Sequence, residues 1–466
     1  MGSAVNIKDT LLCKLADYYA SISYDDIPLK VINKAKRSLV DLLGELAAGF
    51  FVGELAKAVN PYLVELGGKE ESTLLCIGKK MPAMNAALGM GVMSHAIELD
   101  DGHRWGTSHP AVAIIPAVLA MAEREKSSFA EILLAIVIGY DMMLRAARAI
   151  NPAHLKRGFH STGTCGALGA AAACAKLLGL DSTETAYAIS MGGLQSAGLQ
   201  EMLHDHPGVK PLQPGKAAAA GVLSADLAKR GAKAPRTLFE GEHGWLKAMC
   251  DSDYSEEALV GDLGSRFEIL YTYTKLYPTC RHCHAAIDLA REARETLYCD
   301  PADIESIEVK TYRLGIVEVG RIQVPKTQQE AMFSLPFAVA IALTRGNVTL
   351  QDYTPETLSD PKLISLAEKV RVIEDEKLND LYPEERGAHM KVVLKDGRSF
   401  EKYIPVAKGE PENPVSDGDL KEKLEAMLSP YYPKEFLEDL WQIVIEKETE
   451  KQSFDDIIEH FGRYCS

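Results

Sequence analysis

The chain has 466 residues, of which 47% are hydrophobic and 25% are charged, a profile typical of a globular protein too long for one simple core. Its net charge of −15 argues against a nucleic-acid partner, because phosphate binding needs a basic surface. The sequence shows neither a signal-peptide pattern nor a membrane-spanning run, and its nine cysteines do not resemble a secreted disulfide framework. We therefore expect a cytoplasmic protein without a membrane partner.

The first part of the chain shows the three- and four-residue apolar spacing of amphipathic helices. Ala, Gly and Cys dominate residues 161–180, so neighbouring helices can approach this backbone closely. No convincing strand pattern precedes roughly residue 265. The predicted helices span residues 26–48, 82–96, 110–125, 128–149, 161–180, 181–198 and 215–229.

The later part of the chain is mixed. Residues 304–312 alternate apolar and polar as a strand does, and residues 390–404 predict a β-hairpin with Asp396-Gly397 at its turn. The sequence also predicts helices over 328–343 and 361–370, a loop over 406–419, and helices from Leu420 onward. We expect a mostly α protein with an α+β second domain: a helical domain of residues 1–267 plus 409–466 and an α+β domain of 268–408.

An unusual polar cluster lies between two apolar stretches at residues 95–111, HAIELDDGHRWGTSHPA. His95, Glu98 and Asp101 fall at i, i+3 and i+6, so a helix could turn all three to one side. One interpretation is an acid/base site at a helix end. The other is a polar helix terminus whose carboxylates bond local backbone N–H groups, and the cluster alone favours neither.

Two further stretches could bind anions. In GFHST at 158–162, His160 precedes the small-residue helix, where Ser161 or Thr162 could cap and where the helix dipole favours anions. In VKPLQPGK at 209–216, Lys210 could hold a carboxylate, although most lysines are simply solvated. No P-loop pattern is present there.

The stretch KLYPTCRHCH at 275–284 matches the C-x-x-C-H haem-attachment pattern. We expect no haem, because no export signal is seen, and no zinc, because a second Cys/His pair at finger spacing is missing. What remains is a loop with one cation, Lys275, and several hydrogen-bonding groups that leads into a helix from Ala285. His284, near that helix start, could serve a substrate or simply cap.

Together these motifs resemble the MmgE/PrpD family, which includes 2-methylcitrate dehydratase, cis-aconitate decarboxylase and iminodisuccinate epimerase. The resemblance covers most of the chain and also rests on FEGEHGW at 239–245 and EAMFSLPFAVAIAL at 330–343. It implies a homodimer that acts on small di- or tricarboxylates without a nicotinamide or iron–sulfur cofactor, and we predict neither a cofactor nor a metal.

The resemblance also implies roles for individual residues. The catalytic candidates are His109, from the family's H-P pair, His160, Asp101 and Glu98. The substrate-binding candidates are Lys210, Lys275, Arg281, Cys280 and His284. Glu98 stands where the family pattern D-x-D-D begins, Gly102 where the decarboxylase has threonine, and Cys280 where it has histidine.

The predicted function is a cofactor-independent lyase that moves a proton next to a carboxylate, of the dehydratase or decarboxylase type. The loop from Asp101 to His109 and the P-T-C stretch look more like the epimerase, which keeps an epimerase as an alternative. Two other classes also stay open: a metal-dependent hydrolase using His95, Asp101 and His109, and a non-catalytic helical scaffold.

Overall fold

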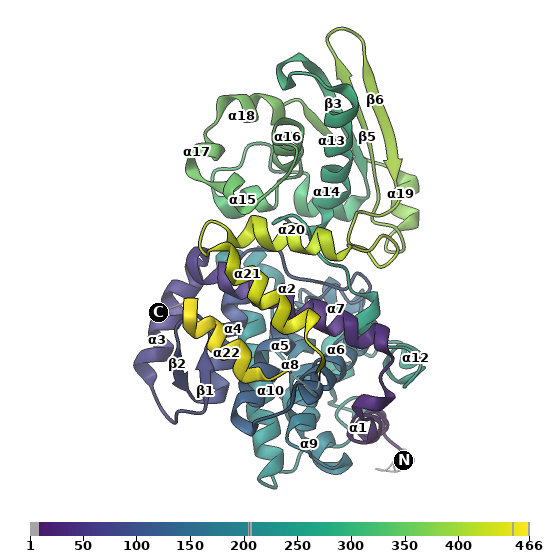
Figure 1. Cartoon of the computed structure of the whole chain (residues 1–466). Coiled ribbons are helices and arrows are strands. Elements are labelled where there is room, and N and C mark those ends of the chain that lie inside the picture. Colours follow the sequence, from purple (N-terminus) through teal and green to yellow (C-terminus); the bar gives the residue numbers. More distant parts are fainter. Residues whose placement is uncertain (1–8, 204, 206, 450–451, 465–466) are drawn as a thin grey trace. The chain divides into compact units, whose positions relative to one another are not determined.

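The structure, a computed structural model, describes residues 9–203, 205, 207–449 and 452–464 (Figure 1). The chain divides into two compact units, each described by itself below. The helical unit comprises residues 1–272 and 428–466, and the mixed unit comprises residues 273–427. The sequence analysis predicts domain boundaries at 267/268 and 408/409, whereas the two units divide at 272/273 and 427/428. The second boundary differs more, because residues 409–427, which include most of α20, group with the mixed unit.

The helical unit consists of a bundle with two C-terminal helices. The predicted helices are all present, with shifted ends. The elements of this unit are α1 (Leu11–Ser21), α2 (Leu29–Val52), α3 (Glu54–Leu66), β1 (Ser72–Leu74), β2 (Lys79–Met81), α4 (Ala83–Ser94), α5 (Ala111–Glu125), α6 (Phe129–Ile150), α7 (Ala153–Lys156), α8 (Ser161–Leu177), α9 (Ser182–Leu194), α10 (Leu212–Lys229), α11 (Trp245–Cys250), α12 (Glu256–Val260), α21 (Lys434–Trp441) and α22 (Phe454–Tyr464).

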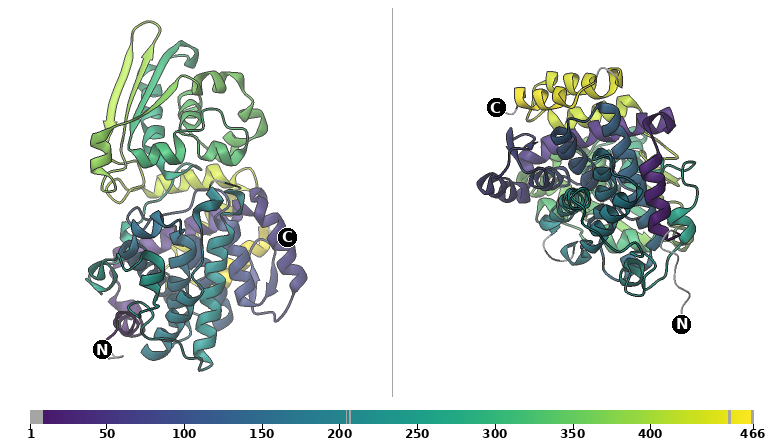
Figure 2. Two further views of the ribbon diagram at one scale, coloured as in Figure 1. Left: turned by 180° about the vertical axis from the view of Figure 1, so that it is seen from behind. Right: turned by 90° about the horizontal axis from the view of Figure 1, so that it is seen from below.

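The centre of this unit is α8, which packs against α5, α6, α9 and α10 (Figures 1 and 2). The predicted close approach of its neighbours is confirmed at two glycines. A Cβ atom at Gly169 would lie 2.5 Å from the main-chain oxygen of Gly139 on α6, and one at Gly221 on α10 would lie 2.3 Å from Ala170 Cβ. Only glycine allows these backbones to pack so closely.

The expectation of no strand before residue 265 is wrong, because β1 and β2 form a small antiparallel pair. Each has three residues, too short to produce a readable alternation of apolar and polar residues. Their turn uses left-handed backbone at Cys76 and Gly78.

The mixed unit contains one four-stranded sheet in the order β4-β3-β5-β6. β3 pairs in parallel with β4 and antiparallel with β5, and β5 and β6 form the predicted hairpin, with Gly397 at φ 88° in the turn. The elements are α13 (His284–Leu297), β3 (Ile304–Thr311), α14 (Arg313–Val319), α15 (Gln328–Met332), α16 (Leu335–Arg345), α17 (Pro355–Leu358), α18 (Pro361–Ala367), β4 (Val370–Glu374), α19 (Glu376–Leu381), β5 (Ala388–Leu394), β6 (Ser399–Ile404) and α20 (Asp417–Leu428).

Two predictions in this unit need correction. The helix expected over 361–370 ends at Ala367, and Val370 begins β4, a strand that the sequence analysis missed. The helix expected over 328–343 is two helices, because Ser334 caps α16 by accepting a hydrogen bond from the Phe337 N–H at 3.1 Å. The mostly α fold class with an α+β part is confirmed. No helix in the described part of the chain is long and apolar enough to cross a membrane.

Candidate active site

The polar cluster at residues 95–111 lies in a loop between α4 and α5, not on a helix as its spacing suggested. Helix α4 ends at Ser94, and Glu98 has a left-handed backbone with φ 54°. The loop is closed where the His103 N–H donates to the Ser108 carbonyl at 2.8 Å. Side-chain directions here are therefore set by loop geometry, so helical spacing does not apply.

His109 is held at the end of this loop by its Nδ1 atom. Nδ1 lies 2.8 Å from the Asp101 carbonyl oxygen and 3.0 Å from Asp100 Oδ2. Both partners are acceptors, so Nδ1 carries the proton and the lone pair of the neutral ring is on Nε2. The His109 N–H donates to Thr162 Oγ1 at 3.1 Å, which ties the loop to the first turn of α8. The imidazole is therefore oriented as a base with Nε2 as its reactive atom.

Asp100 contacts two histidines at once. Its Oδ1 atom lies 3.0 Å from His95 Nδ1 and its Oδ2 atom lies 3.0 Å from His109 Nδ1, and its side chain is fully buried. The centroids of the His95 and His109 rings are 5.1 Å apart. Asp100 was not among the predicted site residues. The pair of adjacent aspartates was the available signal, but the sequence could not tell which of them faces the histidines.

Asp101 takes a different position from its neighbour. Its carboxylate accepts hydrogen bonds from the Ala111 N–H at 3.1 Å and from the Tyr140 hydroxyl at 2.9 Å. Burial raises the pKa of Asp101 to about 7, against the opposing effect of Lys34. Its side chain thus anchors the start of α5, and it reaches His109 through its main-chain carbonyl.

His160 directly precedes α8, as predicted, but neither Ser161 nor Thr162 caps that helix. Its Nδ1 atom lies 2.6 Å from Gln213 Oε1. Because the amide nitrogen of Gln213 donates to the Leu199 carbonyl, Oε1 is the acceptor and His160 also presents its lone pair on Nε2. Burial, followed by Lys210, His95 and His109, holds the pKa of His160 well below its usual value.

Lys210 forms a buried ion pair with Glu98. The structure therefore brings together Glu98, Asp101, His109, His160 and Lys210, the five site residues predicted in the helical unit.

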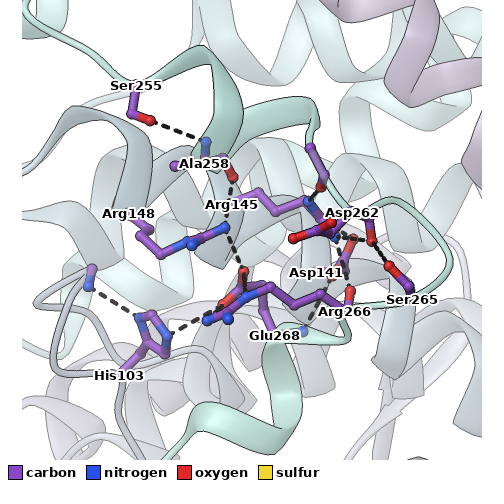
Figure 3. A network of polar contacts seen from close by, with 12 residues as sticks. His103, Asp141, Arg145, Arg148, Ser255, Ala258, Asp262, Ser265, Arg266 and Glu268 are labelled. Carbon is purple, nitrogen blue, oxygen red and sulfur yellow. Dashed lines mark hydrogen bonds and ion pairs between the residues drawn. The ribbon is translucent and has the colours of Figure 1, made fainter.

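A second polar network contacts the loop through the His103 side chain (Figure 3). His103 Nε2 lies 3.4 Å from Glu268 Oε2, and Arg148 and Arg266 also pair with this carboxylate. Burial would raise the pKa of Glu268, but His103, Arg266 and Arg148 outweigh burial and lower it to about 2. These residues fix the loop, and no motif or spacing in the sequence indicates their pairing.

In the mixed unit, the predicted residues lie in the segment that leads into α13. Arg281 Nε donates to Glu410 Oε1 at 3.0 Å, and Arg281 Nη1 donates to His284 Nδ1 at 2.9 Å. Burial, followed by Arg281 and Lys275, holds the pKa of His284 well below its usual value. His284 is thus a neutral ring, and Lys275 is buried beside it.

Glu410 was missed by the sequence analysis, since it lies in the predicted loop over 406–419. The preceding residue, Gly409, has φ 98°, and a Cβ atom there would lie 2.0 Å from the Thr274 carbonyl oxygen. This close approach lets the loop bring Glu410 to Arg281.

The C-x-x-C-H segment shows two different cysteine environments. The Cys280 thiol is partly exposed, while Cys283 is buried. Among the described residues, no group of three or more His, Cys, Asp or Glu side chains has the arrangement of a metal site. The absence of haem and zinc stays a prediction.

Comparison with known proteins gives similarity along nearly the whole chain. The model of the MmgE/PrpD N-terminal domain matches residues 13–257, and that of the MmgE/PrpD C-terminal domain matches residues 277–447. The cis-aconitate decarboxylase-like protein oryM of Aspergillus oryzae is 26% identical over 94% of both chains. Cis-aconitate decarboxylase of Homo sapiens is 28% identical over 89% of this chain and 87% of its own. The mitochondrial 2-methylcitrate dehydratase of Yarrowia lipolytica is 21% identical over 84% and 78%, respectively.

Proposed function

The chain belongs to the MmgE/PrpD family, and from this premise we propose that it is a cofactor-independent lyase acting on a small di- or tricarboxylate. The relatives named above are a decarboxylase-like protein, a decarboxylase and a dehydratase, and decarboxylases and dehydratases are lyases. The observation that carries the proposal is the fixed orientation of His109, whose Nδ1–H faces the Asp101 carbonyl and Asp100 and whose Nε2 holds the lone pair.

In the proposed reaction, His109 Nε2 takes a proton from the carbon next to a substrate carboxylate. The C–H bonding pair moves into that carboxylate, which becomes enolate-like and gains negative charge. In a dehydration, this electron pair then expels a neighbouring hydroxyl as water after that group is protonated. In a decarboxylation, the C–C bond to a carboxylate breaks in place of a C–H bond: its electron pair moves into the remaining conjugated carboxylate as carbon dioxide leaves, and protonated His109 then delivers one proton to carbon.

Cations must hold the charge that builds on the substrate. Lys210 of the helical unit and Lys275 of the mixed unit are the proposed carboxylate-binding residues, with Arg281 as a further cation. The pairing of Lys210 with Glu98 means that a bound carboxylate would replace Glu98 as the partner of Lys210. His160, kept neutral beside Lys210, is the proposed second acid/base group.

An epimerase is the second candidate, and a specific observation favours it. Epimerisation needs one base to remove a proton and another group to return one from the opposite face. His109 and His160 both donate through Nδ1 and present the lone pair on Nε2, as two proton-transfer groups would.

Proton NMR in heavy water separates these possibilities. The protein is incubated with 2-methylcitrate, cis-aconitate, citrate or iminodisuccinate, with and without a chelator. A new vinylic product indicates dehydration or decarboxylation, whereas deuterium exchange at carbon with inversion and no lost group indicates epimerisation. No turnover and no exchange with any carboxylate would refute the proposed function. Activity abolished by the chelator would favour the metal-dependent hydrolase instead.

A further inference from the structure

The loop between α4 and α5 contains a buried carboxylate to which the proposed chemistry has so far assigned no role. Asp100 lies between the two imidazoles of His95 and His109, with one oxygen 3.0 Å from each Nδ1 atom. Its side chain and that of His95 are fully buried, while that of His109 is 15% exposed. Of these three residues, only His109 can therefore contact a substrate.

The neighbouring carboxylate cannot take this role. The oxygens of Asp101 are occupied by the Ala111 N–H and the Tyr140 hydroxyl, and Asp101 meets His109 only through its main chain. A main-chain carbonyl fixes the tautomer of a ring but carries no full charge. An ionised carboxylate can also stabilise the imidazolium that forms when the ring accepts a proton.

We propose that Asp100 is the positioning residue of His109 and that His95 holds Asp100 in place from behind. In this His95–Asp100–His109 relay, the Asp101 carbonyl sets the His109 tautomer and Asp100 stabilises the ring once Nε2 is protonated. His95 donates through Nδ1 to the second oxygen of Asp100, so that the carboxylate cannot rotate away. The structure shows both Asp100 contacts as ion pairs at 3.0 Å, and in the proposed relay they align as hydrogen bonds when substrate binds, as catalytic contacts commonly do.

The charged and titratable groups around His109 must be considered together. In the loop itself these are His95, Glu98, Asp100 and Asp101, and from α8 and the segment before α10 they are His160 and Lys210. Because Lys210 is paired with Glu98 and His160 is neutral, Asp100 is the negative charge in direct contact with the His109 ring.

The relay rests on the proposed function for its effect on turnover, but its central test needs no substrate. Protein labelled with 15N in its histidine rings is titrated by NMR as wild type, Asp100→Asn and Asp101→Asn. We expect the His109 pKa to fall by about one pH unit or more in D100N, because the anion that favours the charged ring is lost, and to fall by less in D101N. Equal shifts in the two variants, or none in D100N, would overturn the role of Asp100.

Kinetics and the His95 variants complete the test. In D100N we expect kcat to fall by about 10²- to 10⁴-fold with little change in KM, since orientation and charge act on the transition state. His95→Asn keeps a donor toward Asp100 and should retain the His109 titration, whereas His95→Phe should lower the His109 pKa as D100N does. Identical His109 titrations in H95N and H95F would overturn the role of His95. If D100N does not fold, H95N and H95F still decide whether a hydrogen-bond donor at position 95 must hold the Asp100 carboxylate in place. If no carboxylate is turned over, the titrations still decide the relay.

Discussion

Lys210 and Glu98 are 112 positions apart in the sequence, and their side chains form an ion pair that is only 7% and 10% exposed. A buried pair of this kind is costly to break, because a lone charge would remain in an apolar setting. A substrate carboxylate that replaces Glu98 gives Lys210 a new negative partner, and the displaced Glu98 must then take up a proton or find another partner. A neutral ligand in the same place would leave Lys210 unpaired, so the arrangement favours anions.

Lys210→Met should weaken substrate binding. A lost hydrogen bond to a charged group is worth about 1.5 to 3 kcal/mol, so KM should rise roughly tenfold to a hundredfold. Lys176→Met is the matched control in the same unit, because Lys176 Nζ donates to the carbonyls of Tyr19, Ala20 and Ile22. The control should lower the melting temperature and leave KM unchanged. An unchanged KM and kcat in K210M would remove Lys210 from the site.

Lys275→Met tests the corresponding residue of the mixed unit. Lys275 is 1% exposed, and its removal should weaken binding of the same carboxylate substrates by a similar factor. Lys402→Met removes a lysine of the same unit that pairs with Glu292 at 2.6 Å and should change neither KM nor kcat. Equal steady-state constants for K275M and K402M would contradict the assignment.

His109→Gln should fold and lose turnover. Loss of a general acid or base typically costs about 10²- to 10⁴-fold in rate, and glutamine preserves the approximate size of the ring. His389→Gln is the control, because His389 lies on β5 of the mixed unit beside Glu401 at 3.3 Å. Near wild-type turnover in H109Q, with an unchanged circular dichroism spectrum in both variants, would argue against His109 as the proton carrier.

The long elements of the fold could be predicted because their apolar spacing and their end signals agree. Helix α6 was expected over 128–149 and spans Phe129–Ile150, since Ser128 and Glu131 form a capping box at its start. The strands β1 and β4 were missed because three and five residues are too few for a period to stand out from the apolar residues around them.

The candidate site was predictable in its parts but not in its pairing. Resemblance to a family pointed to His109 and Lys210, because their motifs are readable in order along the chain. Which carboxylate contacts which ring depends on two left-handed residues, Glu98 at φ 54° and Thr107 at φ 45°, and on the turn closed by His103 and Ser108. Such loop geometry follows from long-range packing, so helical spacing and the family resemblance both selected Asp101 and passed over Asp100.

Alkylation should distinguish Cys280 from the other thiols. Among the described cysteines, only Cys280 and Cys299 are partly exposed, and the others are buried. In a Cys299→Ser background, iodoacetamide should inactivate the enzyme through Cys280, and a bound carboxylate should slow this inactivation. The Cys280→Ser/Cys299→Ser double variant is the control and should resist the reagent. Inactivation at an unchanged rate with saturating substrate would place Cys280 outside the substrate site.

His460 should make the stability of the protein depend on pH in mildly acidic solution. The imidazole is 1% exposed and packs between Phe436 and Tyr464, with ring centroids at 4.4 and 5.2 Å. Burial lowers its pKa to about 4, against the opposing effect of Asp439. The folded chain therefore keeps this ring neutral, while the unfolded chain protonates it near its ordinary pKa of about 6.5.

Because the folded-state pKa lies below the unfolded one, the unfolded chain binds more protons between those values. The stabilising contribution of neutral His460 is fully present above pH 6.5 and is lost progressively as the pH falls toward about 4. At about 1.4 kcal/mol per pH unit, the loss amounts to roughly 3 kcal/mol at most. His460→Phe keeps an aromatic ring in the same cluster and cannot be protonated, so its unfolding free energy should fall less steeply over this range. Urea titrations at several pH values between 8 and 4 measure both slopes. Parallel curves for the wild type and H460F would show that this histidine does not titrate on unfolding.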